Sequence, residues 1–208
     1  MIALVTGAAG FLGSHLVDAL LGREYRVIGL DDLSTGSLEN LTDAWATGHF
    51  IFRACDVSAA IDVANGVDVV FHFASPAGRY DCERLALETL RVNGRGTDLC
   101  CQLALRNGAR LVYASIPPET NASCEASSVY GEAKRYGESI VGAYARGSGL
   151  DARIVRMYDV YGPRLRLSRG GAVSIFIGQA LREAAFTIDG DDTQSVALSY
   201  VDDVVDAV

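Results

Sequence analysis

Short apolar runs alternate with longer amphipathic stretches along this chain. The continuous apolar runs predict strands at residues 2–5, 26–30, 50–52, 67–73, 110–114 and 152–156. Between several of them, apolar residues recur every three or four positions, which predicts helices at 11–20, 85–106 and 130–147. Aliphatic strands that alternate with helices are typical of a parallel sheet covered on both faces. We therefore expect an α/β fold built on a doubly wound parallel sheet.

Polar and glycine residues gather where the predicted strands end. Ligands of open α/β sheets bind at this edge, so the site is expected there. Two irregular stretches, 116–128 and 162–171, also follow strands. Because binding and catalytic residues are often carried by such loops, both stretches are candidate active-site loops.

Composition narrows the class of protein. The chain has 208 residues, half of them apolar, a size that predicts one domain with a substantial core. Its net charge of −8 disfavours nucleic acid and anionic membrane surfaces as partners. No apolar run reaches the roughly 18 residues of a membrane span, and the stretch 1–22 lacks the basic start of a signal peptide.

The five cysteines are odd in number, irregularly spaced and without a CxxC pair. This pattern predicts free core thiols in a reducing compartment, and it predicts no metal site. We therefore expect a cytoplasmic protein.

A glycine-rich turn joins the first predicted strand to the first predicted helix. Gly7 permits a tight turn, Gly10 lets the backbone approach a pyrophosphate, and Gly13 allows the helix to pack closely on the strand. Asp31 ends the second strand, where a carboxylate accepts ribose hydroxyls and repels a 2′-phosphate. The pattern therefore favours NAD over NADP as the cofactor.

Tyr130 and Lys134 form a second motif. Lys134 is the only lysine among 18 basic residues, and it lies four positions after Tyr130 in a predicted helix, so the two side chains share a face. A neighbouring ammonium lowers the pKa of a phenol, which otherwise is too high for a base near neutral pH. Tyr130 and Lys134 are therefore candidate catalytic residues, against the alternative of a solvated surface pair.

These motifs together resemble the extended short-chain dehydrogenase/reductase family, in particular its NAD-dependent nucleotide-sugar epimerases, dehydratases and decarboxylases. Segments 31–37, 71–77 and 161–164 are most similar to the UDP-glucuronate decarboxylase branch. The resemblance implies a Rossmann-type NAD-binding domain at 1–158. It also implies a mixed segment at 159–208, which contributes the remaining sheet and a truncated substrate-binding appendage.

The resemblance also implies residue roles. Tyr130 takes a proton from a sugar hydroxyl as hydride passes to nicotinamide, and Lys134 holds the nicotinamide ribose. Members commonly dimerise through the helices that match 85–106 and 130–147, so a homodimer is implied. The other cofactor contacts carried over are Gly7, Gly10, Phe11, Leu12, Gly13, Asp31, Asp32, Asp56, Val57, Phe73, Ala74, Ser75 and Asn93.

The chain departs from the family pattern on the substrate side. Ile116 follows Ser115 where the family has a second hydroxyl, so the candidates for that hydroxyl are Ser115, Thr120 and Ser123. Pro117 and Pro118 lie where the decarboxylase branch has a catalytic glutamate, with Glu119 one position away. Asp159 and Ile175 replace asparagines that meet the nucleotide diphosphate, and Val196 replaces an arginine.

Three functions stay open at this point. The first is an enzyme that modifies a nucleotide sugar through a transient keto-sugar. The second is an NAD-binding protein without turnover, a sensor or partner subunit, which an eroded substrate half would suit. The third is a dehydrogenase for a small non-nucleotide alcohol. Retention of Tyr130 and Lys134 favours an enzyme, since a binding module gains little from the tyrosine.

Overall fold

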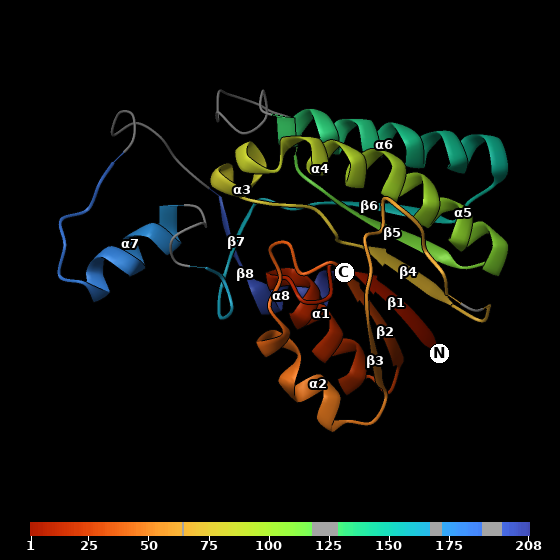
Figure 1. The fold of residues 1–208 in the computed structure, drawn as a ribbon, viewed down its shortest axis with the longest axis horizontal. Coiled ribbons are helices and arrows are strands. Elements are labelled where there is room, and N and C mark those ends of the chain that lie inside the picture. Colours follow the sequence, from red (N-terminus) through yellow and green to blue (C-terminus); the bar gives the residue numbers. More distant parts are fainter. Residues whose placement is uncertain (64, 118–128, 167–171, 189–196) are drawn as a thin grey trace.

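A six-stranded parallel sheet forms the centre of the computed structural model (Figure 1). The structure describes residues 1–63, 65–117, 129–166, 172–188 and 197–208. The sheet order is β3-β2-β1-β4-β5-β6, and every neighbouring pair is parallel. Because the order proceeds outward from β1 on both sides, the sheet is doubly wound and Rossmann-type, as predicted. The strands are β1 (Ile2–Thr6), β2 (Arg26–Asp31), β3 (Phe50–Ala54), β4 (Val69–His72), β5 (Arg110–Ser115) and β6 (Ala152–Arg156).

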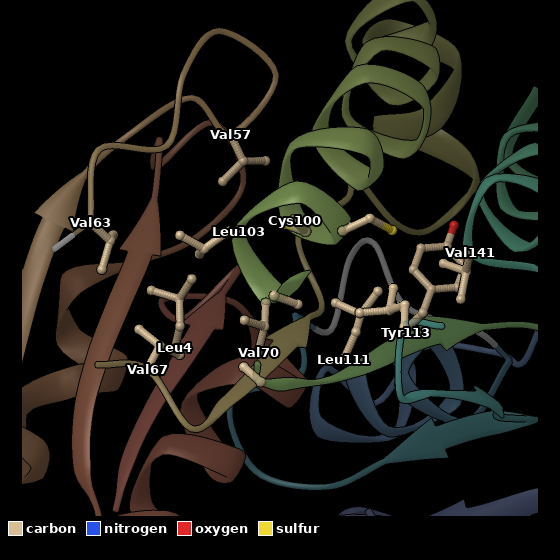
Figure 2. Close-up of a cluster of buried hydrophobic side chains, with 14 of the residues drawn as sticks. Leu4, Val57, Val63, Val67, Val70, Cys100, Leu103, Leu111, Tyr113 and Val141 are labelled. Carbon is tan, nitrogen blue, oxygen red and sulfur yellow. The ribbon is translucent and has the colours of Figure 1, made fainter. Parts of the chain in front are cut away.

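Helices cover both faces of this sheet, and successive strand residues point to opposite sides (Figure 1). Leu4 of β1, Leu103 of α5 (Thr97–Asn107) and Val141 of α6 (Val129–Ser148) belong to the same buried cluster on one side of the sheet (Figure 2). Val5 packs on the other side with Val17 of α1 (Phe11–Gly22). Helices η1 (Leu38–Leu41) and α2 (Thr42–Ala46) lie on this side as well.

The helix predicted at 85–106 is not one continuous α-helix. The structure has α3 (Arg79–Arg84), a break at Leu85, α4 (Ala86–Arg91) and then a π-helical turn, η2 (Val92–Gly96), which leads into α5. Gly94 and Gly96 lie in this turn, where glycine weakens regular helix and a π-bulge is tolerated. Apolar periodicity did not reveal the bulge, because the residues on both sides keep their helical spacing.

The segment after β6 forms a second, smaller sheet. Strands β7 (Asp159–Tyr161) and β8 (Leu198–Tyr200) pair in parallel, with α7 (Ala172–Leu181) between them in the chain. Helix α8 (Val201–Ala207) returns to α1, where Asp206 pairs with Arg23 at 2.9 Å. The six-stranded sheet is complete at Arg156, and the predicted domain division at 158/159 stays a prediction.

Within the described residues, no helix combines the length and apolar character needed to cross a membrane. Cys82, Cys100 and Cys101 are buried, and Cys55 is partly buried. Cys124 lies outside the described residues.

Candidate active site

A cleft of about 320 Å³ opens at the carboxyl ends of the parallel strands. Residues from the β1–α1 turn, from the ends of β2 to β5 and from the start of α6 line it. The structure thus brings together nearly all of the predicted site residues. Those that line the cleft are Gly7, Gly10, Phe11, Leu12, Gly13, Asp31, Asp32, Asp56, Val57, Phe73, Ala74, Ser75, Ser115, Tyr130 and Lys134.

The glycine turn has no room for side chains. Gly7 has a φ of +73°, and a Cβ there would lie 2.8 Å from the backbone nitrogen of Ala74. A Cβ on Gly13 would overlap the carbonyl oxygen of Gly7 and lie 2.7 Å from its carbonyl carbon. Helix α1 begins at this point with Gly10 as its N-cap and no side-chain cap, so its first N–H groups are open to an anion. This geometry fits the pyrophosphate of a dinucleotide.

Asp31 lies next to this turn and has a role that the sequence did not reveal. The residue is only 8% exposed, and its carboxylate accepts the N–H groups of Ala9 (2.9 Å) and Leu33 (2.8 Å). Burial raises the pKa of Asp31, against the lowering effect of these two hydrogen bonds. Asp31 therefore holds the glycine turn as well as facing the cleft. Asp32 is exposed beside it and accepts the N–H of Ser34 at 2.9 Å.

Lys134 is buried, not a solvated surface residue. Its side chain lies on the cleft side of α6, with the residue 3% exposed, and Nζ donates to the carbonyl oxygen of Ala114 at 3.0 Å. Nζ also lies 5.5 Å from the ring centroid of Tyr130 and 5.3 Å from that of Tyr113. Burial lowers the pKa of Lys134 to about 7. When Lys134 is protonated, its positive charge therefore lies beside the ring of Tyr130.

Asn93 is not among the residues that line the cleft. It is fully buried behind the wall and donates from Nδ2 to Ser75 Oγ at 2.8 Å and to the Thr89 carbonyl at 2.9 Å. Its Oδ1 accepts from the Tyr113 hydroxyl at 3.1 Å, and that hydroxyl is 3.4 Å from the Lys134 carbonyl oxygen. Asn93 therefore orients the Ser75 side chain from behind the cleft wall. Tyr113, which was predicted only as a strand residue, connects Asn93 to the backbone of Lys134.

His72 is a structural residue of the same wall. It is fully buried, with Nδ1 2.8 Å from Thr6 Oγ1 and Nε2 3.1 Å from Thr97 Oγ1. Burial, with a smaller effect of Lys134, lowers the pKa of His72 from 6.5 to about 3. The ring is therefore neutral near pH 7. Thr6 Oγ1 in turn accepts the N–H groups of Phe73 and Ala74, which orders the loop after β4.

The substrate end of the cleft lies beyond Ser115. Its hydroxyl oxygen is buried and has no partner at hydrogen-bond geometry among the described residues. The Glu138 carboxyl nevertheless lies near enough for this hydroxyl to lower the pKa of Glu138, after the larger effect of Arg156. Ser115 also lines the cleft at the end of β5, so its residue lies where a substrate oxygen could approach. Beyond it the cleft is lined by Ile116, Met157, Tyr158, Asp159, Val160, Arg164, Leu165 and Arg166.

The other predicted substrate-side positions are not in this cleft lining. Ile175 is on α7, with 38% of its surface exposed. Glu119, Thr120, Ser123 and Val196 lie outside the described residues. Conversely, Arg164 lines the cleft without having been assigned a role, and its guanidinium pairs with Asp18 of α1 at 2.7 Å. The described residues contain no group of three or more side chains suited to hold a metal ion.

Comparison with known proteins gives consistent results. The model of a family described as NAD dependent epimerase/dehydratase matches residues 3–208. UDP-glucuronic acid decarboxylase 1 of Arabidopsis thaliana is 35% identical over 225 residues, which cover 99% of this chain and 50% of that relative. UDP-glucose 4-epimerase from Thermotoga maritima, solved with UDP-glucose, gives a TM-score of 0.85 at 30% identity, with 100% of this chain and 72% of that chain covered.

A second solved structure contains the cofactor. UDP-glucuronic acid 4-epimerase from Bacillus cereus, in complex with UDP-glucuronic acid and NAD, gives a TM-score of 0.84 at 29% identity. That match covers 99% of this chain and 71% of that chain. The present chain spans about half the length of the curated decarboxylase that it matches.

Proposed function

Because the chain belongs to the NAD-dependent epimerase/dehydratase family, with NAD as its cofactor, we propose that it is an enzyme that modifies a nucleotide sugar through a transient keto-sugar. The observation that carries this proposal is the buried Lys134 ammonium 5.5 Å from the Tyr130 ring, in the same cleft as the glycine turn. The relatives named above act on UDP sugars, which supports the substrate class.

The residues of the cleft fit NAD. The turn at Gly7 and Gly13 excludes any Cβ, and the open N–H groups of α1 would hold the pyrophosphate. Asp31 and Asp32 would accept the adenosine ribose hydroxyls, and Lys134 would hold the nicotinamide ribose. When bound, NAD supplies a hydride acceptor and returns the hydride in the same site.

Tyr130 is the acid/base residue in this proposal. As phenolate it removes the proton from a sugar hydroxyl, and it returns the proton when the ketone is reduced again. Lys134 in its protonated form favours the phenolate by its charge, and Ser115, which lines the same cleft, offers its hydroxyl to the reacting oxygen. Retention of the keto-sugar between the two steps permits epimerisation, elimination or loss of a carboxylate.

The test is the pair Tyr130→Phe and Tyr136→Phe. Both tyrosines are on α6, but Tyr136 is 58% exposed and does not line the cleft. With UDP sugars as substrates, we expect Tyr130→Phe to lower kcat by roughly 100-fold or more, as loss of a general base does. NAD affinity should stay unchanged, and Tyr136→Phe should behave as the wild type. Full activity of Tyr130→Phe would refute the assignment.

Ile116 in the cleft wall supports a second candidate, an NAD-binding protein without turnover. An isoleucine cannot hydrogen-bond a reacting sugar oxygen. This candidate predicts tight NAD binding and no formation of reduced nicotinamide with any UDP sugar or simple alcohol. Reduction by small alcohols alone would instead indicate the third possibility, a dehydrogenase for a non-nucleotide substrate.

We also propose a homodimer that pairs through α4 and α6. Four large apolar side chains are exposed on these helices: Leu87 (62%), Leu90 (41%), Val129 (39%) and Tyr136 (58%). A second copy of the chain would cover them. Light scattering should give twice the chain mass, and Leu87→Glu should give the monomer mass. For the compartment we propose the cytoplasm, supported by the buried free thiols of Cys100 and Cys101.

A further inference from the structure

A tight turn after β7 forms part of the cleft wall at the substrate end. It covers residues 162–165, and the N–H of Leu165 closes it by donating to the carbonyl oxygen of Gly162 at 3.3 Å. Arg164, the third residue of the turn, has a φ of +66°, in the left-handed region that favours glycine. Arg164, Leu165 and Arg166 all line the cleft. The turn is therefore a strained piece of the cleft wall.

Two side chains of the cofactor helix α1 hold this turn. His15 Nε2 lies 3.0 Å from the carbonyl oxygen of Pro163, and because a carbonyl oxygen only accepts, Nε2 is the donor. Asp18 pairs with Nη2 of Arg164 at 2.7 Å, and both side chains of this ion pair are largely shielded from solvent (32% and 21% exposed). Since His15 and Asp18 are three residues apart in the helix, both contacts come from one face of α1.

Arg164 occupies this position in spite of two energetic costs. A side chain in the left-handed region strains the backbone, and glycine at this position would not. The Nη1 atom of Arg164 is also buried without a hydrogen-bond partner among the described residues, which further lowers stability. Strain of this kind is found mainly at functional sites, where it is kept for the sake of the site. The two costs therefore indicate that the Arg164 side chain serves the cleft rather than stability.

The guanidinium of Arg164 supports the wall and does not reach into the cleft. Nη2 pairs with Asp18, and Nη1 is covered by protein atoms. The helix that holds it also forms the cofactor end of the cleft, since Gly10 is the N-cap of α1 and Phe11 lines the cleft. The Phe11 ring lies edge-on to the His15 ring, with 5.7 Å between the centroids. One helix thus contacts both ends of the cleft.

We infer that His15 and Asp18 are positioning residues for the nucleotide sugar. By holding the turn 162–165 on α1, they fix the wall of the substrate end relative to the cofactor end. The inference rests on the proposed function. Neither His15 nor Asp18 lines the cleft, so both act through the turn. Binding of the nucleotide sugar depends on this contact, whereas binding of NAD, at the N-terminal end of α1, does not.

The experiment is a calorimetric titration of the NAD-loaded protein with UDP-glucose, and of the NAD-free protein with NAD. Asp18→Asn keeps the size of the side chain and removes its charge. We expect it to weaken UDP-glucose binding roughly tenfold, because the turn then adopts its binding geometry only part of the time, and to leave NAD affinity unchanged. Arg164→Gln should give the same loss. The double variant should be no weaker than either single variant, since all three lack the same contact.

Two glycine variants separate the ion pair from the backbone strain. Arg164→Gly removes both, and we expect the same roughly tenfold loss of UDP-glucose affinity. Glu24→Gly is the matched control: Glu24 follows α1, is exposed and has a φ of +63°, so the change removes a left-handed side chain away from the cleft. It should leave both affinities unchanged. In turnover assays Asp18→Asn should raise KM for UDP-glucose with little change in kcat, because Tyr130 and Lys134 are untouched.

The outcomes distinguish the inference from the proposed function. Wild-type UDP-glucose affinity in Asp18→Asn or in Arg164→Gly would overturn the inference and leave the proposed function standing. An equal loss of NAD affinity in Arg164→Gln would also overturn it, because Arg164 would then serve the cofactor. If the NAD-loaded wild type binds neither UDP-glucose nor UDP-glucuronic acid, the proposed function fails and the inference fails with it.

Discussion

Replacement of Gly137 by alanine tests whether the wall behind Lys134 is as closely packed as the structure has it. Gly137 is buried on α6, and its Cα faces the Tyr113 ring. An added Cβ would overlap the Tyr113 hydroxyl oxygen and would lie 2.5 Å from Cζ and 3.1 Å from the Asn93 carbonyl oxygen. Because Tyr113 is fully buried, its ring has no free space into which to move.

Two effects of this substitution lower the free energy of unfolding, and one effect raises it. Overpacking a filled core costs about 1–3 kcal/mol. A displaced Tyr113 leaves the buried Asn93 Oδ1 without its 3.1 Å hydrogen bond, at a cost of about 1–3 kcal/mol. Alanine gains up to about 1 kcal/mol over glycine in a helix. We expect Gly137→Ala to lower the free energy of unfolding by about 3 kcal/mol, which for a chain of this size lowers Tm by roughly 10 °C.

Gly147→Ala is the matched control. Gly147 lies in the same helix, and a Cβ there would meet nothing within 4 Å. It should therefore be neutral or stabilising by up to about 1 kcal/mol. Urea denaturation followed by circular dichroism gives both values. If Gly137→Ala has the same midpoint as Gly147→Ala, the close approach of α6 to Tyr113 is wrong.

Three further predictions concern the cofactor half. Gly13→Ala should abolish NAD binding in a calorimetric titration, because the added Cβ would overlap the Gly7 carbonyl oxygen. Gly22→Ala in the same helix is the control: its Cβ would meet nothing within 4 Å, so this variant should bind NAD normally. Asp31→Asn should weaken NAD binding more than NADP binding, and an unchanged ratio of the two affinities would contradict its role at the ribose. The pKa of His72 is about 3 in the folded protein, against the ordinary value of 6.5 expected in the unfolded chain. Between these two pH values the unfolded chain binds a proton that the folded protein does not. The free energy of unfolding should therefore fall with decreasing pH, by at most about 1.4 kcal/mol per pH unit. Denaturation at pH 7 and pH 5 should show a shallower dependence in His72→Gln, and equal slopes would remove His72 as the cause.

The sequence alone was sufficient for the sheet and for the cofactor turn. Both depend on local signals. A strand such as Val69–His72 is recognised from the apolar residues of the strand itself. The spacing of Gly7, Gly10 and Gly13 likewise indicates the backbone conformation of a single turn between a strand and a helix. The four-residue separation of Tyr130 and Lys134 likewise placed both on one helical face, because the helix repeat is a local property.

Other features depended on contacts between residues far apart in the chain. Nothing in the sequence indicated that Asn93 would face Tyr113 and Ser75 from behind the wall, because a π-helical turn changes which side of the helix it occupies. The burial that lowers the pKa of Lys134 also comes from packing against β5, not from its neighbours in the chain. Asp159 was recognised as a departure from the family, but only the structure showed that it lines the cleft together with Arg164, which pairs with Asp18 of α1. Local patterns are encoded in neighbouring residues, whereas burial and charge pairing depend on which distant segments the fold brings together.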